Sequence, residues 1–133
     1  MSVWCHFLPG ENHLSAKAVI TDLTEAGLSP VALDLRDASG PGVLFFNEIN
    51  QNLFELLRQL SSNGLVRVLA VALSSRALAR GDVWRLLQAG ASDAFAWDHS
   101  STPAREVVAR LERWVSVDKL LNSPLVKNKE GMQ

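Results

Sequence analysis

The chain has 133 residues, of which 47% are hydrophobic and 20% are charged. This length suits a single domain, and the composition excludes the low-hydrophobicity pattern of a disordered chain. With 13 basic and 14 acidic residues the formal net charge is -1. That balance gives no general attraction for phosphate backbones, so direct nucleic-acid binding is not expected.

Cys5 is the only cysteine. A lone cysteine excludes an intramolecular disulfide and a cysteine-based zinc site, which fits a reducing compartment. The sequence shows no secretion signal and no apolar run of about 18 residues, the length of a membrane span. We therefore expect a cytoplasmic protein without membrane contact.

The first part of the chain predicts two strands, one helix and a loop. A short apolar run over residues 3–8 predicts the first strand, and Asn12 is positioned to cap a helix over 15–26. A second strand is predicted over 31–35. Residues 36–42 contain Asp, Ser, Pro and two glycines, which predicts a loop with at most one helical turn.

The middle of the chain predicts two further strand–helix units. A strand over 43–46 precedes a helix over 49–60, whose large apolar residues recur at spacings of three and four. The nearly unbroken apolar run 66–73 predicts a strand buried on both faces. Asp82 is expected to cap the next helix, which Gly90 ends.

The last part predicts a fifth strand and a long final helix. The strand covers 94–97, and Thr102 followed by Pro103 is a strong helix start. The apolar pattern of this helix continues to Pro124. We expect one folded domain over 1–122 and a linker or tail toward an absent downstream domain over 123–133.

Alternating strands and helices of this length predict an α/β protein. The expected architecture is a flavodoxin-like (βα)5 fold, a doubly wound parallel sheet of strand order 2-1-3-4-5 in three α/β/α layers. Such sheets bind ligands at the carboxyl ends of their strands. The sequence places polar or aromatic residues of a possible ligand pocket at that edge, namely Glu11, Asn47, Ser74, Ser75, Trp97 and Asp98.

The run Gln-Ala-Gly-Ala-Ser-Asp-Ala-Phe over residues 88–95 resembles the signature that precedes the fifth strand of response-regulator receiver domains. Those domains hold magnesium between acidic residues after the first strand and a phospho-accepting aspartate after the third. A hydroxyl follows the fourth strand and a lysine the fifth. The resemblance, with the order of elements, covers nearly the whole domain.

At the positions of this chemistry the sequence departs from the family. The acceptor falls on Asn47, the hydroxyl on Ser74 or Ser75, and the lysine on Trp97, while Glu11 is the nearest carboxylate after the first strand. An amide is neither a nucleophile for an acyl phosphate nor an anionic magnesium ligand. The resemblance therefore implies a pseudo-receiver, with these degenerate positions and no metal, cofactor or catalytic residue.

Residues 114–126 resemble the linker between such domains and the ATPase domain of bacterial sigma-54-dependent transcription activators. This implies signal transduction and transcription regulation, with a downstream ATPase domain as a partner. No GxxxxGK[ST] motif occurs in the chain, so ATP hydrolysis is not expected.

Tryptophan and other apolar residues near the end of the chain predict a symmetric homodimer through the last helix. The proposed dimer or linker face consists of Trp84, Trp114, Val117, Leu120 and Leu121. Its apolar pattern continues past the expected end of the domain, where core packing explains it poorly.

The sequence gives little support to a catalytic function. The three histidines share no metal-ligand spacing, and no GxSxG nucleophile elbow is present. Two rivals stay open beside the regulatory interpretation. One is a small-molecule sensor, for instance for a nucleotide, at the strand-edge pocket; the other is an unconventional phospho-receiver using Glu11, Glu48 or Asp98.

Overall fold

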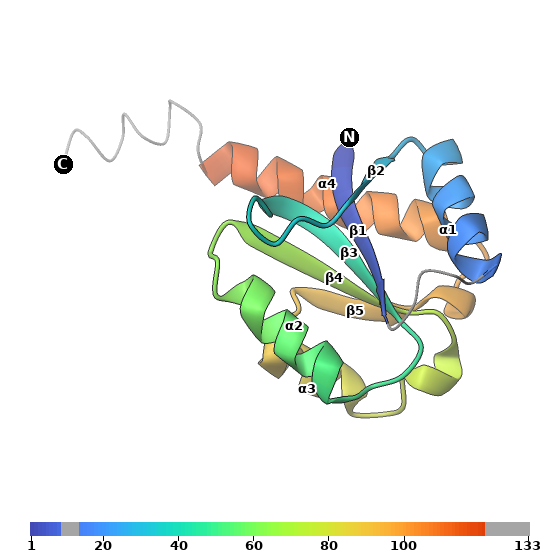
Figure 1. Ribbon diagram of the computed structural model, residues 1–133. Helices are drawn as coiled ribbons and strands as arrows, with labels where there is room; N and C mark the ends of the chain where they lie inside the picture. Colours follow the sequence, from blue (N-terminus) through green and yellow to red (C-terminus); the bar gives the residue numbers. More distant parts are fainter. Residues whose placement is uncertain (9–13, 122–133) are drawn as a thin grey trace.

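The computed structural model describes residues 1–8 and 14–121, and its centre is a parallel sheet of five strands (Figure 1). The strand order is β2-β1-β3-β4-β5, and all neighbouring pairs are parallel. The strands are β1 (Ser2–Leu8), β2 (Ser29–Ala32), β3 (Gly40–Phe46), β4 (Val66–Ala72) and β5 (Asp93–Ala96). The expected order 2-1-3-4-5 and flavodoxin-like class are confirmed.

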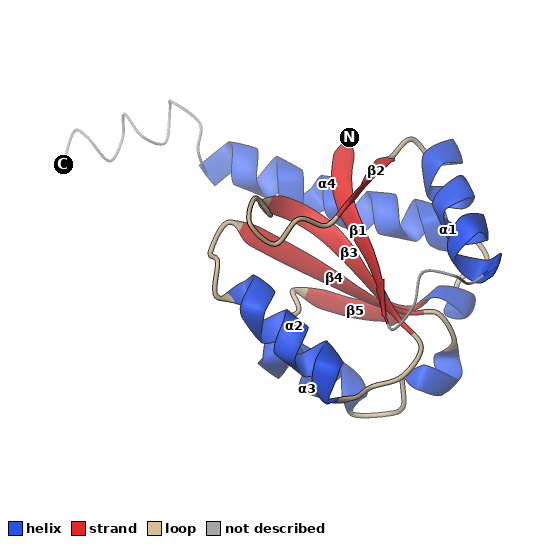
Figure 2. Ribbon diagram, in the orientation of Figure 1, coloured by secondary structure: helices blue, strands red, loops and turns tan. Residues whose placement is uncertain are grey.

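Helices cover both faces of the sheet, which gives three layers (Figure 2). The helices are α1 (Leu14–Glu25), α2 (Gln51–Ser61), α3 (Asp82–Ala89) and α4 (Pro103–Leu121), with two 3-10 turns, η1 (Ser75–Ala77) and η2 (Trp97–His99). One buried cluster joins α1 and α4 to the sheet, and a second cluster joins α2 and α3 to the opposite face. Within the described ranges, no helix is both long and apolar enough to cross a membrane.

Helix starts agree with the sequence for α4 and differ for α2 and α3. α4 begins at Pro103 as expected, whereas the helix predicted from residue 49 begins at Gln51, where the Asn50 side chain caps it by accepting a hydrogen bond from the Leu53 N–H. Asp82 was expected to cap α3, but the cap is Gly81 and Asp82 is the first helical residue. Its carboxylate accepts from the backbone N–H of Ala79 instead. The predicted cap Asn12 lies outside the described residues.

Between β2 and β3 the chain forms no helix, so the described part of the fold has four helices instead of the five of a complete (βα)5 unit. The seven residues 33–39 form a turn over 35–37 and otherwise irregular backbone. Their composition explains this, because Asp34, Asp37 and Ser39 favour turns over helix interiors. The sheet face above β1 and β2 therefore needs another cover.

Trp4 supplies part of this cover. Its side chain is buried on the α2 and α3 side of the sheet, in the cluster that includes Ala38 and, at its rim, Leu33 from the connecting loop. The indole lies so close to Gly42 on the paired strand that an added Cβ atom at Gly42 would overlap it. A residue without a side chain is thus required beneath the indole.

Replacing Gly42 with alanine should destabilise the fold by about 1–3 kcal/mol, the usual cost of overpacking a filled core. Gly64 offers a matched control, since an added Cβ there meets nothing within 4 Å. Gly64→Ala should change the free energy of unfolding by less than about 0.5 kcal/mol. Urea unfolding followed by circular dichroism measures both; equal effects would refute the close packing of Trp4 on Gly42.

Cys5 lies on the opposite face, in the cluster beneath α1 and α4. Burial disfavours the thiolate and raises the pKa of the Cys5 thiol from 9.0 to about 12. The thiol is thus a core residue with little reactivity in the folded chain.

This pKa predicts a loss of stability in alkali. Between pH 9 and about 12 the unfolded chain releases the Cys5 proton while the folded chain keeps it. The stabilising contribution of this residue is fully present below pH 9. Above pH 9 the free energy of unfolding should fall by about 1.4 kcal/mol per pH unit as this contribution is lost. Urea unfolding at pH 8.5 and 10.5 tests this, with Cys5→Ala expected to show a smaller fall. Equal slopes for both chains would contradict it.

Candidate functional site

The carboxyl ends of β3, β4 and β5 present the residues singled out by the sequence. Asn47 follows β3 directly, Ser74 lies two residues beyond β4, and Trp97 follows β5. Because these strands are neighbours in the sheet, their ends lie at one edge (Figure 1). Glu11, the carboxylate expected from the first loop, lies outside the described residues.

Asn47 carries an exposed amide at the end of the buried strand β3. Among residues 1–8 and 14–121, no group of three or more His, Cys, Asp or Glu side chains is placed to hold a metal ion. The amide can donate and accept hydrogen bonds, but it cannot form an acyl phosphate. Position 47 therefore offers hydrogen bonding in place of a carboxylate.

The two serines after β4 have different roles. The Ser74 hydroxyl oxygen accepts a hydrogen bond from the Arg76 N–H at 3.2 Å and caps η1. Ser75 donates from its N–H to Asp98 Oδ1 at 2.8 Å and from its hydroxyl to Asp98 Oδ2 at 3.4 Å. Asp98 thereby ties the turn after β4 to the turn after β5, which leads into α4.

Trp97 turns away from Asn47 and Ser74. Its ring is half-buried in the core beneath α1 and α4 and meets Phe45 edge to face, with centroids 5.9 Å apart. Phe45 in turn stacks on Phe7 at 4.6 Å. The structure thus divides the expected pocket, because Trp97 belongs to the core of one face while Asn47 and Ser74 line a cavity toward the other.

That cavity, of about 480 Å³, lies between the ends of β3 and β4 and the start of α3. Its wall includes Asn47, Ser74, Arg76 and Arg85. Sequence reasoning missed the two arginines. Arg76 stands two residues beyond Ser74 and could have been suspected from that position, but nothing in the sequence shows that Arg85 on α3 reaches the same space.

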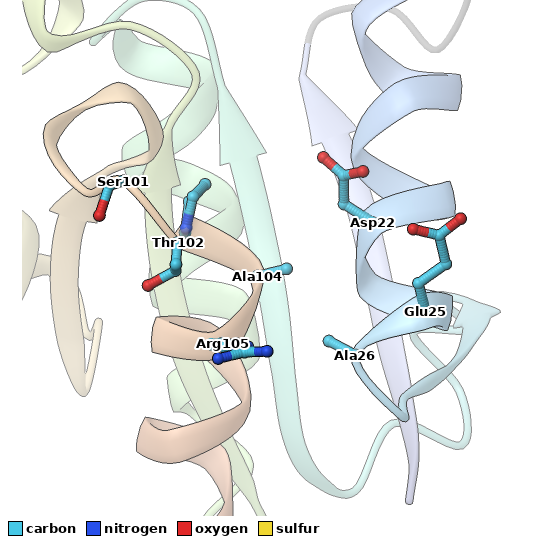
Figure 3. Close-up of a pocket in the computed structure, with 8 residues that line it drawn as sticks. Asp22, Glu25, Ala26, Ser101, Thr102, Ala104 and Arg105 are labelled. Atoms are coloured by element: carbon cyan, nitrogen blue, oxygen red, sulfur yellow. The ribbon is translucent and has the colours of Figure 1, made fainter.

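A second cavity, of about 400 Å³, lies between the C-terminal half of α1 and the start of α4 (Figure 3). Asp22 and Glu25 stand on the α1 wall, and Thr102 and Arg105 on the α4 wall. The walls carry opposite charges. No sequence pattern pointed to this groove.

The residues of the predicted dimer or linker face do not form one surface. Trp84 is 65% exposed on α3, whereas Leu120 and Leu121, 69% and 61% exposed, belong to α4 on the other side of the sheet. Val117 is also exposed, and Trp114 packs against the core beneath α4. Only the α4 residues therefore share an apolar face.

An ion pair fixes the end of α4 to the sheet. Arg67, at the start of β4, donates from Nη2 to Asp118 Oδ1 at 2.6 Å and from Nε to Oδ2 at 3.2 Å. A two-bond pair of this geometry orients both groups, although both side chains are about 40% exposed. The exposed apolar residues that follow are thus presented from an anchored helix.

The residues of the signature 88–95 have structural roles in this fold. Gly90 has φ +128, and an added Cβ there would lie 2.9 Å from the Leu57 carbonyl oxygen and overlap Ser61 of α2. Asp93 forms an ion pair with Arg110 of α4, whose guanidinium also stacks on Phe95. Close packing of α2 on α3, and of β5 on α4, explains this sequence without phosphorylation chemistry.

The comparisons with known proteins give no relative: no family model, curated protein or solved structure matches this chain.

Removing the Asp98 carboxylate should loosen the turn after β4. Asp98→Ala deletes both acceptors of Ser75, so the Ser75 amide hydrogen should exchange at least about tenfold faster, with a loss of about 1 kcal/mol in stability at this exposed site. Asp98→Asn keeps one acceptor oxygen, so its Ser75 exchange rate should lie between those of the parent chain and Asp98→Ala. Hydrogen exchange followed by NMR measures this; unchanged exchange at Ser75 would refute the link between the turns.

Proposed function

We propose that this chain is a non-catalytic regulatory domain, a pseudo-receiver that controls assembly or activity of a transcription activator without aspartyl phosphorylation. The observation that carries the proposal is Asn47 at the end of β3, in a fold of strand order 2-1-3-4-5. An amide at this position leaves the domain without the nucleophile of the receivers that it resembles in sequence.

The second support is that the surrounding groups are engaged in structural bonds. The Asp98 carboxylate accepts from Ser75, and the Glu48 carboxylate accepts from the Asn50 side chain at 3.2 Å. Neither is grouped with other acidic side chains of the described chain into a cation site. A rigid scaffold that exposes contact surfaces is the function that these residues support best.

The proposed contact surface is the C-terminal end of α4, with Val117, Leu120 and Leu121. These residues are exposed, and the Arg67–Asp118 pair holds the helix that carries them. We propose that the surface pairs two copies, or joins the domain to a downstream ATPase domain through residues 123–133. A reducing cytoplasm is the proposed compartment, with which the buried Cys5 is compatible.

Sedimentation analysis over a wide concentration range tests the pairing. The double variant Leu120→Glu, Leu121→Glu should stay monomeric where the parent chain dimerises, because two charges would be desolvated at the interface. Both side chains are exposed, so the fold should be unaffected. The control is Leu35→Glu, which replaces an exposed leucine in the loop before β3; this variant should dimerise like the parent chain.

A parent chain that is monomeric throughout would overturn the pairing. Loss of the dimer in Trp84→Glu alone would move the interface to α3. The absence of phosphorylation chemistry is tested in parallel with beryllofluoride and Mg²⁺, which should leave both mass and melting temperature unchanged. A response that disappears in Glu48→Gln or Asp98→Asn would instead establish the unconventional phospho-receiver.

A further inference from the structure

The cavity between β3, β4 and α3 gathers hydrogen-bond donors on one wall. Asn47 contributes an amide, Arg76 and Arg85 contribute guanidinium groups, and Ser74 contributes a hydroxyl. The Ser74 oxygen accepts from the Arg76 N–H, and its own proton is donated to no group of the described residues. Four donors from three separate segments thus face one space.

The two carboxylates of this wall have donors of their own. Asp82 accepts from the Ala79 N–H at 2.7 Å and from Arg85 at 3.4 Å, and Glu48 accepts from Asn50. Their negative charge is therefore partly satisfied within the protein. These two carboxylates are therefore less available to bind a ligand than the donor groups are.

The arginines are held differently. Arg85 lies over the Phe54 ring, with its guanidinium carbon 5.1 Å from the centroid, and pairs with Asp82 at 3.4 Å, so contacts within the protein orient its guanidinium group. The guanidinium of Arg76 contacts no acceptor among the described residues, and neither does the Asn47 amide. The Arg76 and Asn47 side chains thus remain for an external acceptor, beside the Arg85 guanidinium, which is already oriented.

We infer that this cavity binds a small phosphorylated molecule through Asn47, Ser74, Arg76 and Arg85. A phosphate group has several acceptor oxygens and a charge near −2, and arginine is well suited to bind it. The volume of about 480 Å³ falls in the range of ligand sites, and the place is the strand edge at which doubly wound sheets bind ligands. The site does not rest on pairing through α4.

Isothermal titration with pyrophosphate and with adenosine monophosphate, at constant ionic strength, tests the inference. The parent chain should bind at least one of the two phosphates, with a rise in melting temperature, and should bind the dicarboxylate malonate at least about tenfold more weakly. Arg76→Ala should weaken binding at least about tenfold, since it removes a charged donor that makes no contact in the folded chain. Asn47→Ala should weaken it by a smaller factor.

Arg105→Ala, which removes an exposed arginine on the opposite face, is the matched control and should bind like the parent chain. Absence of binding by both phosphates, or equal binding by Arg76→Ala and the parent chain, would overturn the inference. Equal binding of malonate would overturn the assignment to phosphate. The same titration on the Leu120→Glu, Leu121→Glu variant should show unchanged affinity, so failure of the dimer and failure of the site are distinguishable.

Discussion

Burial of β3 and β4 on both faces is the constraint on which the rest of this structure depends. Residues 43–46 and 68–72 have almost no exposed surface, so each face of the sheet must be covered by a layer of its own. Helices α1 and α4 cover one face completely enough to bury Cys5 and Phe45. On the other face α2 and α3 leave the region above β1 uncovered, and Trp4 with the loop before β3 fills it over Gly42.

The same constraint explains why the carboxyl edge is divided. Backbone leaving a buried strand must turn toward one face or the other, and the side chain at the turn then joins the layer on that side. Trp97 joins the aromatic stack beneath α1 and α4, whereas Asn47 and Ser74 face the cavity beside α3. A single pocket that includes all three residues, as expected from their positions at strand ends, therefore does not form.

The elements that the sequence predicted best are those fixed by burial. The leucine spacing of α2 identifies a helix by its periodicity, and the apolar run of β4 identifies a buried strand by its short length and β-branched content. The edge strand β2 was predicted over 31–35 but forms over Ser29–Ala32, because pairing with β1 sets its register from Ser29 onward. Arg85 in the cavity and Arg67 paired with Asp118 depend on long-range geometry, which no local pattern encodes.

Strand β4 connects the two parts of the proposed function. At its carboxyl end the turn from Ser74 to Ala77 lines the cavity and is bonded through Ser75 to Asp98, shortly before α4 begins. At its amino end Arg67 bonds Asp118, near the other end of α4. A ligand on Arg76 would therefore act on a turn linked to the helix that carries the proposed contact surface. It can shift that helix only if it binds one arrangement of the turn better than another. The two arrangements would differ in the hydrogen bonds between Ser75 and Asp98. These bonds are exposed and join two turns, so they break more easily than contacts between buried strands.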